Sequence, residues 1–106
     1  MVTYMVHYTV RHEIVDEYTA WLKTEHIPEM LKTPGFVKAE LLLKKGGPMQ
    51  SSSKDIKVVY TLSDEEKLKK YVSESALSLR EKGLEKFPGM FSAQREVWLD
   101  TINFTL

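Results

Sequence analysis

DEYTAWLKTEHIPEMLKTPGF, residues 16–36, is the stretch around which the rest of the chain is organised. It joins an amphipathic segment to a proline with a histidine close before it, and it ends in a Pro34-Gly35 turn. The remaining segments are predicted to form a framework that holds this stretch against a β-sheet.

Residues 13–26 are predicted to form a helix with one apolar face. At about 100° per residue, five apolar side chains fall within an arc of about 120°. These are Ile14, Val15, Tyr18, Trp21 and Leu22. Pro28 cannot extend the hydrogen-bond ladder, and it pushes Ile27 away from the α region. We therefore expect the helix to stop or kink near His26, with a short turn starting at Pro28 and a second one at Thr33-Pro34-Gly35.

Four segments alternate in the period of two that is typical of strands: Thr3–Val10, Phe36–Lys44, Ile56–Leu62 and Phe91–Leu99. Ser63 and Glu66 match a capping box, so a second helix is expected from there to a stop at Gly83. Its predicted buried stripe is Leu68, Tyr71, Val72, Ser75 and Leu79. Residues 45–54 form a polar connection rich in Gly and Ser.

The order β-α-β-β-α-β predicts an α+β protein with the ferredoxin-like arrangement. In this arrangement a four-stranded antiparallel sheet carries both helices on one face. A length of 106 residues is that of one compact domain, so residues 1–106 are expected to form a single domain.

Composition excludes several classes of function. Lys and Arg number 15 and Asp and Glu number 15, so no basic patch for nucleic acid or for an anionic membrane is indicated. The chain has no cysteine, which excludes disulfides, thiolate catalysis and cysteine-ligated metals. Met1 leads directly into a strand-like segment without a signal peptide, and no apolar run reaches the roughly 20 residues of a membrane span. A cytoplasmic protein is expected.

The sheet face without helices is predicted to form a homodimer seam. Among polar residues this face would carry Met5, His7, Phe36 and Leu42. Two such sheets packed face to face would bury these side chains. The alternative is a monomer with a half-solvated sheet.

Two runs, AWLKTEHIPEMLKTPGF and SLREKGLEKFPGMFSAQREVW, resemble an uncharacterised bacterial domain family grouped with the dimeric α+β barrels. The spacing of Trp21, His26, Ile27, Pro28, Met30 and Leu31 carries the resemblance. It implies the fold and the dimer, but no activity and no catalytic residues. The wider superfamily includes cofactor-free monooxygenases, polyketide-type cyclases, muconolactone isomerase-like enzymes and haem enzymes.

His26 is the first candidate for a catalytic residue. It lies beside the expected helix break, and an imidazole titrates near neutral pH, so it would serve as a general base or as a donor to an oxyanion. The alternative is a structural histidine that caps the frayed helix end. An axial haem ligand is a further role for His26, but no other residue supports it.

Arg95 is the second candidate, because it lies on the apolar face of the fourth predicted strand. An arginine there either holds an anionic ligand bidentately or pairs with a buried carboxylate. Glu25 falls near the centre of the buried helix arc, so a structural Glu25–Arg95 pair is the alternative. The predicted ligand-binding side chains are Tyr18, Trp21, Leu22, Glu25 and Tyr60. No metal-ligand spacing and no cofactor motif is found.

Two functions are compatible with these residues. One is a cofactor-independent enzyme of the monooxygenase, cyclase or isomerase kind, acting on a small organic molecule between sheet and helices. The other is a non-catalytic dimeric module that binds a ligand or a protein. A pocket filled by the protein's own Tyr and Trp side chains would favour the second.

Overall fold

The computed structural model describes residues 1–45 and 52–106. The strands are β1 (Val2–Arg11), β2 (Phe36–Leu43), β3 (Ser53–Leu62) and β4 (Phe91–Trp98). The first helical segment consists of the 3₁₀ turn η1 (His12–Ile14), α1 (Val15–Trp21), the π turn η2 (Leu22–His26) and α2 (Ile27–Leu31). The second consists of α3 (Glu65–Glu74) and α4 (Ala76–Lys86). Most of the predicted polar connection, residues 46–51, lies outside the described residues.

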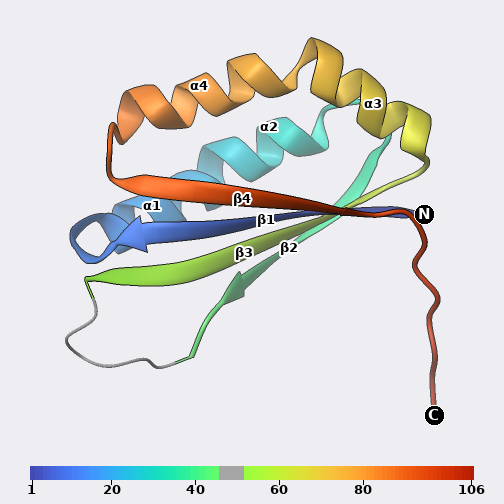
Figure 1. The fold of residues 1–106 in the computed structure, drawn as a ribbon, viewed down its shortest axis with the longest axis horizontal. Coiled ribbons are helices and arrows are strands. Elements are labelled where there is room, and N and C mark those ends of the chain that lie inside the picture. The colour runs from blue at the N-terminus through green and yellow to red at the C-terminus, as the bar shows by residue number, and fades with distance from the viewer. Residues whose placement is uncertain (46–51) are drawn as a thin grey trace.

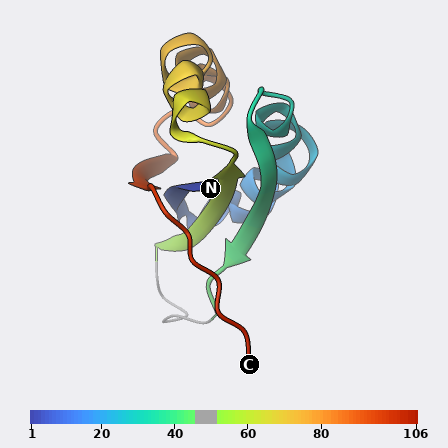
Figure 2. The same ribbon diagram turned by 90° about the vertical axis from the view of Figure 1, so that its right-hand side faces the viewer.

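The four strands form one sheet in the order β2-β3-β1-β4, with every neighbouring pair antiparallel. Both helical segments cover the same face of this sheet (Figure 1). Seen from the end, the α1–α2 segment and the α3–α4 segment lie side by side above the strands (Figure 2). The predicted ferredoxin-like βαββαβ arrangement is confirmed. Among the described residues, no helix is long and apolar enough to cross a membrane.

The core lies between the sheet and the helices. The alternating set of β1 that was predicted to face the helices is buried: Tyr4, Val6, Tyr8 and Val10. On β3 the matching set is Ile56, Val58, Tyr60 and Leu62. Because side chains alternate along a strand, the other face of the same strands remains without helical cover. That face carries Met5 and His7 on β1 and Leu42 on β2.

The first helix does not stop at His26, which was one of the two predicted outcomes; its regular α-geometry is interrupted there by the π turn η2. Ile27 keeps α-helical angles (φ −61°, ψ −45°), and its N–H donates to the carbonyl of Leu22, five residues back. A π turn contains one residue more than an α turn. This wider turn displaces the carbonyl that the Pro28 ring would meet in an uninterrupted α-helix, so the helix continues through the proline.

A β-bulge changes the faces predicted for β2. The register shifts between Phe36 and Lys38, which places Phe36 on the helix-covered face together with Ala39 and Leu41. The Phe36 ring contacts the rings of Tyr60 and Tyr71 at centroid distances of 5.6 and 5.1 Å. The prediction that Phe36 belongs to the dimer seam is wrong, and Val37, which follows it, is exposed. A bulge adds one residue and so reverses the alternation beyond it.

The second helical segment also differs at its ends. Asp64, not Ser63, is the N-cap, and its Oδ1 accepts from the N–H of Lys67 at 2.8 Å. The segment is interrupted at Ser75 and continues past Gly83 to Lys86. Val72 is exposed, whereas Leu68, Tyr71 and Leu79 are buried as predicted. The predicted Pro34-Gly35 turn is confirmed by the positive φ of Gly35 (93°), and Gly89 after Pro88 also has a positive φ (69°).

Candidate functional site

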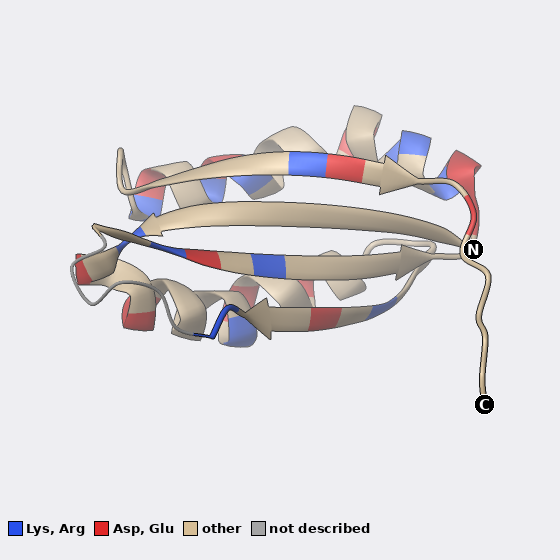
Figure 3. Cartoon of the chain, turned by 60° about the horizontal axis from the view of Figure 1, so that its bottom comes forward, with Lys and Arg blue, Asp and Glu red and all other residues tan. Residues whose placement is uncertain are grey.

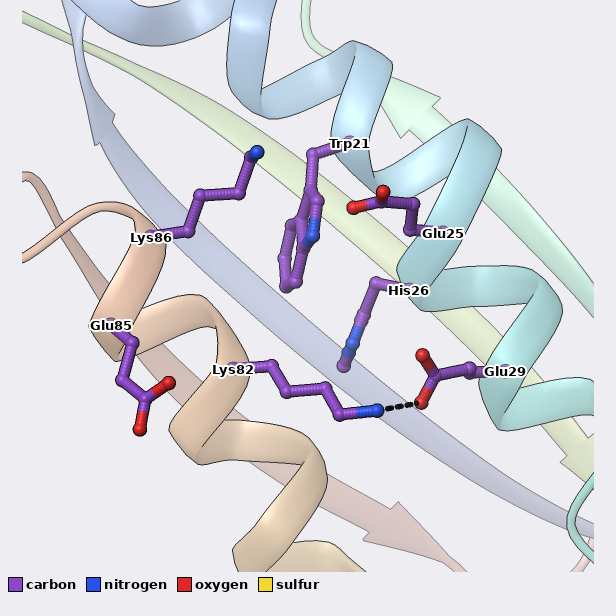
Figure 4. A pocket seen from close by; sticks show the side chains of 7 residues that line it. All are labelled: Trp21, Glu25, His26, Glu29, Lys82, Glu85 and Lys86. Carbon is purple, nitrogen blue, oxygen red and sulfur yellow. Dashed lines mark hydrogen bonds and ion pairs between the residues drawn. The ribbon is translucent and has the colours of Figure 1, made fainter.

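A cleft of about 460 Å³ separates the two helical segments. The η2–α2 side supplies Trp21, Glu25, His26 and Glu29, and α4 supplies Lys82, Glu85 and Lys86. Figure 4 shows the indole of Trp21 and the imidazole of His26 projecting from the first segment into the space that faces α4. Aromatic walls and a ring of charged groups make this cleft the candidate site.

The π turn is what places His26 in the cleft. In an uninterrupted α-helix, Glu25 would continue the buried arc of Tyr18, Trp21 and Leu22. The extra residue of the π turn rotates the following side chains, so Glu25 is exposed and His26 is only 8% exposed. The prediction that Glu25 is buried is therefore wrong. π turns are frequent at functional sites, and this one orients the candidate histidine.

His26 is held by stacking against Trp21. Their ring centroids are 4.8 Å apart and their planes differ by 19°. Among the described residues, no hydrogen bond occupies a ring nitrogen of His26. Trp21 is fixed in turn by Tyr18 and Phe87, at centroid distances of 5.5 and 5.9 Å. The imidazole thus has a rigid plane and nitrogens that are free for a bound molecule.

The surroundings keep the imidazole neutral. Burial is the largest influence and lowers the pKa of His26 to about 4, although the Glu29 carboxylate opposes this. Arg95 and Lys82 add to the lowering as nearby positive charges. At neutral pH the ring therefore carries one proton and one lone pair, and it is able to accept a proton or a hydrogen bond.

An ion pair spans the cleft. Nζ of Lys82 on α4 lies 2.7 Å from Oε2 of Glu29 on α2, as the dashed line in Figure 4 marks. Both side chains are partly exposed, so the pair contributes little to stability. Its position matters more, because it bridges the two helical segments next to His26. A ligand entering here meets both charges.

Beneath the cleft, the interior is filled by aromatic side chains. All five tyrosines of the chain are buried: Tyr4, Tyr8, Tyr18, Tyr60 and Tyr71. Tyr18 makes ring contacts with Tyr8 at 5.4 Å and with Phe91 at 4.9 Å. Burial raises the pKa of Tyr60 well above its usual range, with the neighbouring tyrosines acting in the same direction. The phenol of Tyr60 therefore keeps its proton at neutral pH.

Two buried polar atoms in this interior have no partner among the described residues: Oη of Tyr60 and Nε of Arg80. Arg80 Nη2 donates to Oη of Tyr4 at 3.2 Å. Buried polar groups are nearly always paired with protein or water. Each of the two atoms is therefore open to a hydrogen-bond partner that the described residues do not supply.

Arg95 occupies the face that was predicted for it, but it is exposed. It lies opposite Val6 in the β1–β4 register, on the helix-covered side. Its charge lowers the pKa values of Tyr8 and Tyr18 against the stronger effect of burial. Among the described residues it forms no ion pair with Glu25, so the predicted structural pair is absent. Its guanidinium remains available to an anion.

The predicted site residues divide into two groups. Trp21, Glu25 and His26 line the cleft together. Tyr18, Leu22 and Tyr60 lie in the core below it, each 1% exposed or less. The sequence reasoning missed Glu29, Lys82 and Arg80. Glu29 and Lys82 are 53 residues apart, and no local pattern indicates that they meet. Within residues 1–45 and 52–106, no group of three or more potential ligands is placed to hold a metal ion.

Comparison with known proteins agrees with this fold. The family model described as "Domain of unknown function (DUF4286)" matches residues 1–102. A comparison with curated proteins gives no match.

Solved structures match over nearly their whole length, and three of them illustrate the different kinds of protein that share this fold. The heme-degrader MhuD from Mycobacterium tuberculosis, with two hemes bound in its active site, has a TM-score of 0.71 at 15% identity, covering 99% of this chain and 100% of that one. SnoaB, a cofactor-independent oxygenase from Streptomyces nogalater, has a TM-score of 0.65 at 13% identity, with 99% and 96% covered. An EthD-family protein from Bacillus halodurans has a TM-score of 0.64 at 15% identity, with 91% and 97% covered. At these identities the likeness shows the fold alone, the βαββαβ arrangement described above.

Proposed function

We propose that this chain, which belongs to the DUF4286 family, binds a small, flat organic anion in the cleft between its helical segments. The stacked pair of Trp21 and His26 is the observation that carries this proposal. A planar molecule gains contact area and offset stacking against such a surface. Lys82 and Lys86 line the cleft, and the charge of Arg95 acts on His26, so these three groups would attract the negative charge of the molecule. The cleft is also lined by the carboxylates of Glu25, Glu29 and Glu85.

In the proposed reaction, neutral His26 acts on the bound molecule without a cofactor. The imidazole accepts a proton from a carbon or oxygen acid whose resulting charge is spread over the ring system. Arg95 binds the anionic group and so orients the molecule. Burial weakens neutral His26 as a base, and the negative charge of a bound anion would raise the pKa of the ring and so assist the proton transfer. SnoaB supports this class, because its fold is the same and its described activity needs no cofactor.

The proposed assembly is a homodimer that packs the two uncovered sheet faces together. On that face Leu42 and Trp98 are exposed, and Met5 and Val59 are partly buried beside them. Burying such side chains against a second copy removes apolar surface from water. Because Phe36 lies on the other face of the sheet, Trp98 is the largest apolar side chain of the proposed seam.

A second candidate is a non-catalytic module, and one observation favours it. The space between sheet and helices is filled by the chain's own tyrosines together with Trp21, Phe87 and Phe91. A ligand would then be confined to the cleft above, where binding needs no chemistry. Both candidates place the ligand against Trp21 and His26 and differ only in whether His26 transfers a proton.

The test begins with native mass spectrometry of the freshly purified protein, which reports both the dimer and any retained ligand mass. Binding of the aromatic sulfonate 8-anilinonaphthalene-1-sulfonate is then measured by fluorescence for wild type, His26→Ala, Arg95→Met and the control His12→Ala. His12 is an exposed residue outside the cleft. We expect binding to weaken about tenfold or more in the first two variants and not in the control. Equal binding by His26→Ala, with the fold intact by circular dichroism, would rule out the cleft.

Hydrogen–deuterium exchange at the ligand distinguishes catalysis from binding alone. A retained ligand with an acidic C–H is incubated in D₂O with wild type and with His26→Gln. Deuterium uptake by wild type alone supports the enzyme, and uptake by neither protein supports the module.

A further inference from the structure

The segment that follows β4 carries the three most exposed large apolar side chains of the described structure. Residues 99–106 read LDTINFTL and form no helix or strand. Ile102 is 75% exposed, Phe104 is 88% exposed and Leu106 is fully exposed. Asp100 is the only charged side chain in the segment. A soluble domain rarely presents such a run to water without a partner.

The segment has the pattern of a strand with one apolar side. Ile102, Phe104 and Leu106 alternate with Thr101, Asn103 and Thr105. β-branched and aromatic residues predominate, which favours extended backbone. A strand with one apolar and one polar side is suited to lie on a surface with its polar side toward solvent.

The direction in which the segment leaves the fold shows which surface it can reach. Oγ1 of Thr101 lies 2.9 Å from Oγ1 of Thr3, and Thr3 belongs to the uncovered face of β1. From there the segment runs away from the helices, on the side of the sheet that no helix covers (Figures 1 and 2). It therefore projects into the space that a second molecule on the uncovered face would occupy.

The uncovered face is a suitable surface for an apolar strand. β1, one of the two central strands, carries no Lys, Arg, Asp or Glu before Arg11, as Figure 3 shows. Its neighbour β3 brings Asp55 and Lys57 to the same face, where Asp55 pairs with His7.

Met5 lies opposite Val59, and Trp98 lies opposite Thr3 one step further along the sheet, so this face offers three apolar side chains. The carboxylates of Glu96 and Glu40 flank the row of Met5 and Val59. Trp98 is 56% exposed. The face and the segment thus both have apolar surface that is uncovered in the single chain.

We propose that residues 101–106 form an arm that packs on the uncovered face of a second copy of this chain. The arm and the face belong to the same polypeptide, so a two-fold axis lets each protomer hold the other with the same contacts. Ile102, Phe104 and Leu106 contact the partner, and Asn103 and Thr105 face solvent. This inference rests on the dimer proposed above and extends its interface beyond the sheets.

The proposed arm is tested by replacing the apolar side chains on one side of the segment with serine. The variant Ile102→Ser/Phe104→Ser/Leu106→Ser loses the apolar side, and the control Asn103→Ser/Thr105→Ser changes the polar side of the same segment. Sedimentation velocity over a concentration series gives the dimer dissociation constant of each. Burial of one such side chain is worth roughly tenfold or more in a dissociation constant. We expect a rise of at least about a hundredfold for the apolar variant and less than about threefold for the control.

A cross-linking experiment identifies the surface that the arm contacts. Because the chain has no cysteine, Phe104→Cys carries a benzophenone label at that position alone. Irradiation of mixed ¹⁵N and ¹⁴N protein is expected to give heavy–light cross-links to peptides that contain Met5 or Val59. Cross-links within one chain only would overturn the arm, because they would show that it folds onto its own sheet.

The outcomes separate the arm from the dimer. An apolar variant that dimerises like wild type would refute the arm and leave the sheet-face dimer standing. A wild type that stays monomeric at all concentrations would refute both. Neither result affects binding of the aromatic sulfonate in the cleft, which lies on the opposite side of the sheet.

Discussion

Gly83 of α4 lies so close to Trp21 that a Cβ at position 83 would be 3.1 Å from Cη2 of the indole. The glycine was predicted to end the second helix, yet it lies inside it and is buried. Its missing side chain lets the two helical segments approach at the point where Trp21 stacks on His26. The width of the candidate cleft at that point therefore depends on this residue.

Gly83→Val is expected to lower the free energy of unfolding by about 1–3 kcal/mol, the usual cost of overpacking a filled core. Gly83→Ala should stay within about 1 kcal/mol of wild type, because its gain in helix propensity offsets the tight contact. Urea unfolding followed by circular dichroism measures both. Leu84→Val at the exposed neighbouring position controls for β-branching and should change little. A Gly83→Val protein as stable as wild type would mean that Trp21 moves freely.

The buried neutral state of His26 predicts a loss of stability in acid. Its pKa in the folded protein is lowered to about 4 from the ordinary 6.5, so the unfolded chain binds a proton that the folded chain excludes. Stability is therefore unaffected by this group above pH 6.5 and falls as the pH drops from 6.5 to 4. The loss amounts to roughly 3 kcal/mol.

The measurement is urea unfolding of wild type and His26→Gln at several pH values from 7.5 to 4.5. The difference between the two proteins isolates this histidine from the carboxylates that titrate in the same range. An NMR titration of the His26 ring checks the pKa directly. A midpoint above pH 6 would contradict both the burial and the proposed neutral base.

The N-cap of α3 gives a prediction that distinguishes two adjacent residues. Asp64→Ala should cost about 1 kcal/mol, because the side chain accepts from the Lys67 N–H and its charge is favourable at a helix N-terminus. Ser63→Ala should cost less than about half as much, since the Ser63 hydroxyl donates only to the Asp64 carboxylate, at 3.3 Å, and the backbone hydrogen bond of Ser63 to Gly35 is kept. Thermal unfolding of both variants decides between them. The reverse order would restore the capping box expected from the sequence.

Tyr60→Phe and Tyr4→Phe remove the same atom from two stacked rings. Oη of Tyr60 has no partner among the described residues, so its removal should be neutral or stabilising by up to about 1 kcal/mol. Removal of Oη from Tyr4 leaves Arg80 Nη2 without that acceptor and should cost about 1–2 kcal/mol. Chemical denaturation gives both values. A clear loss of stability in Tyr60→Phe would show that its hydroxyl binds a molecule in the core.

The helix-facing residues of β1 were predictable because a strand's alternation is a local property. Tyr4, Val6, Tyr8 and Val10 follow the period of two without interruption, and they are buried. The arc of Tyr18, Trp21 and Leu22 was predictable for the same reason, since it lies before the π turn begins to change the phase. Where one residue is added, as in η2 and in the β2 bulge, counting along the sequence places the following side chains on the wrong face.

The sequence by itself determined the element order, the ferredoxin-like topology and the side of each regular element that enters the core, because these depend on periodicity and turn chemistry within a few residues. Only the tertiary structure decided that His26 rather than Glu25 enters the cleft and that Lys82 meets Glu29. It also decided that Gly83 makes room for Trp21. These depend on how two helices, joined by a sheet and more than fifty residues of chain, pack against each other, and no local pattern records that contact.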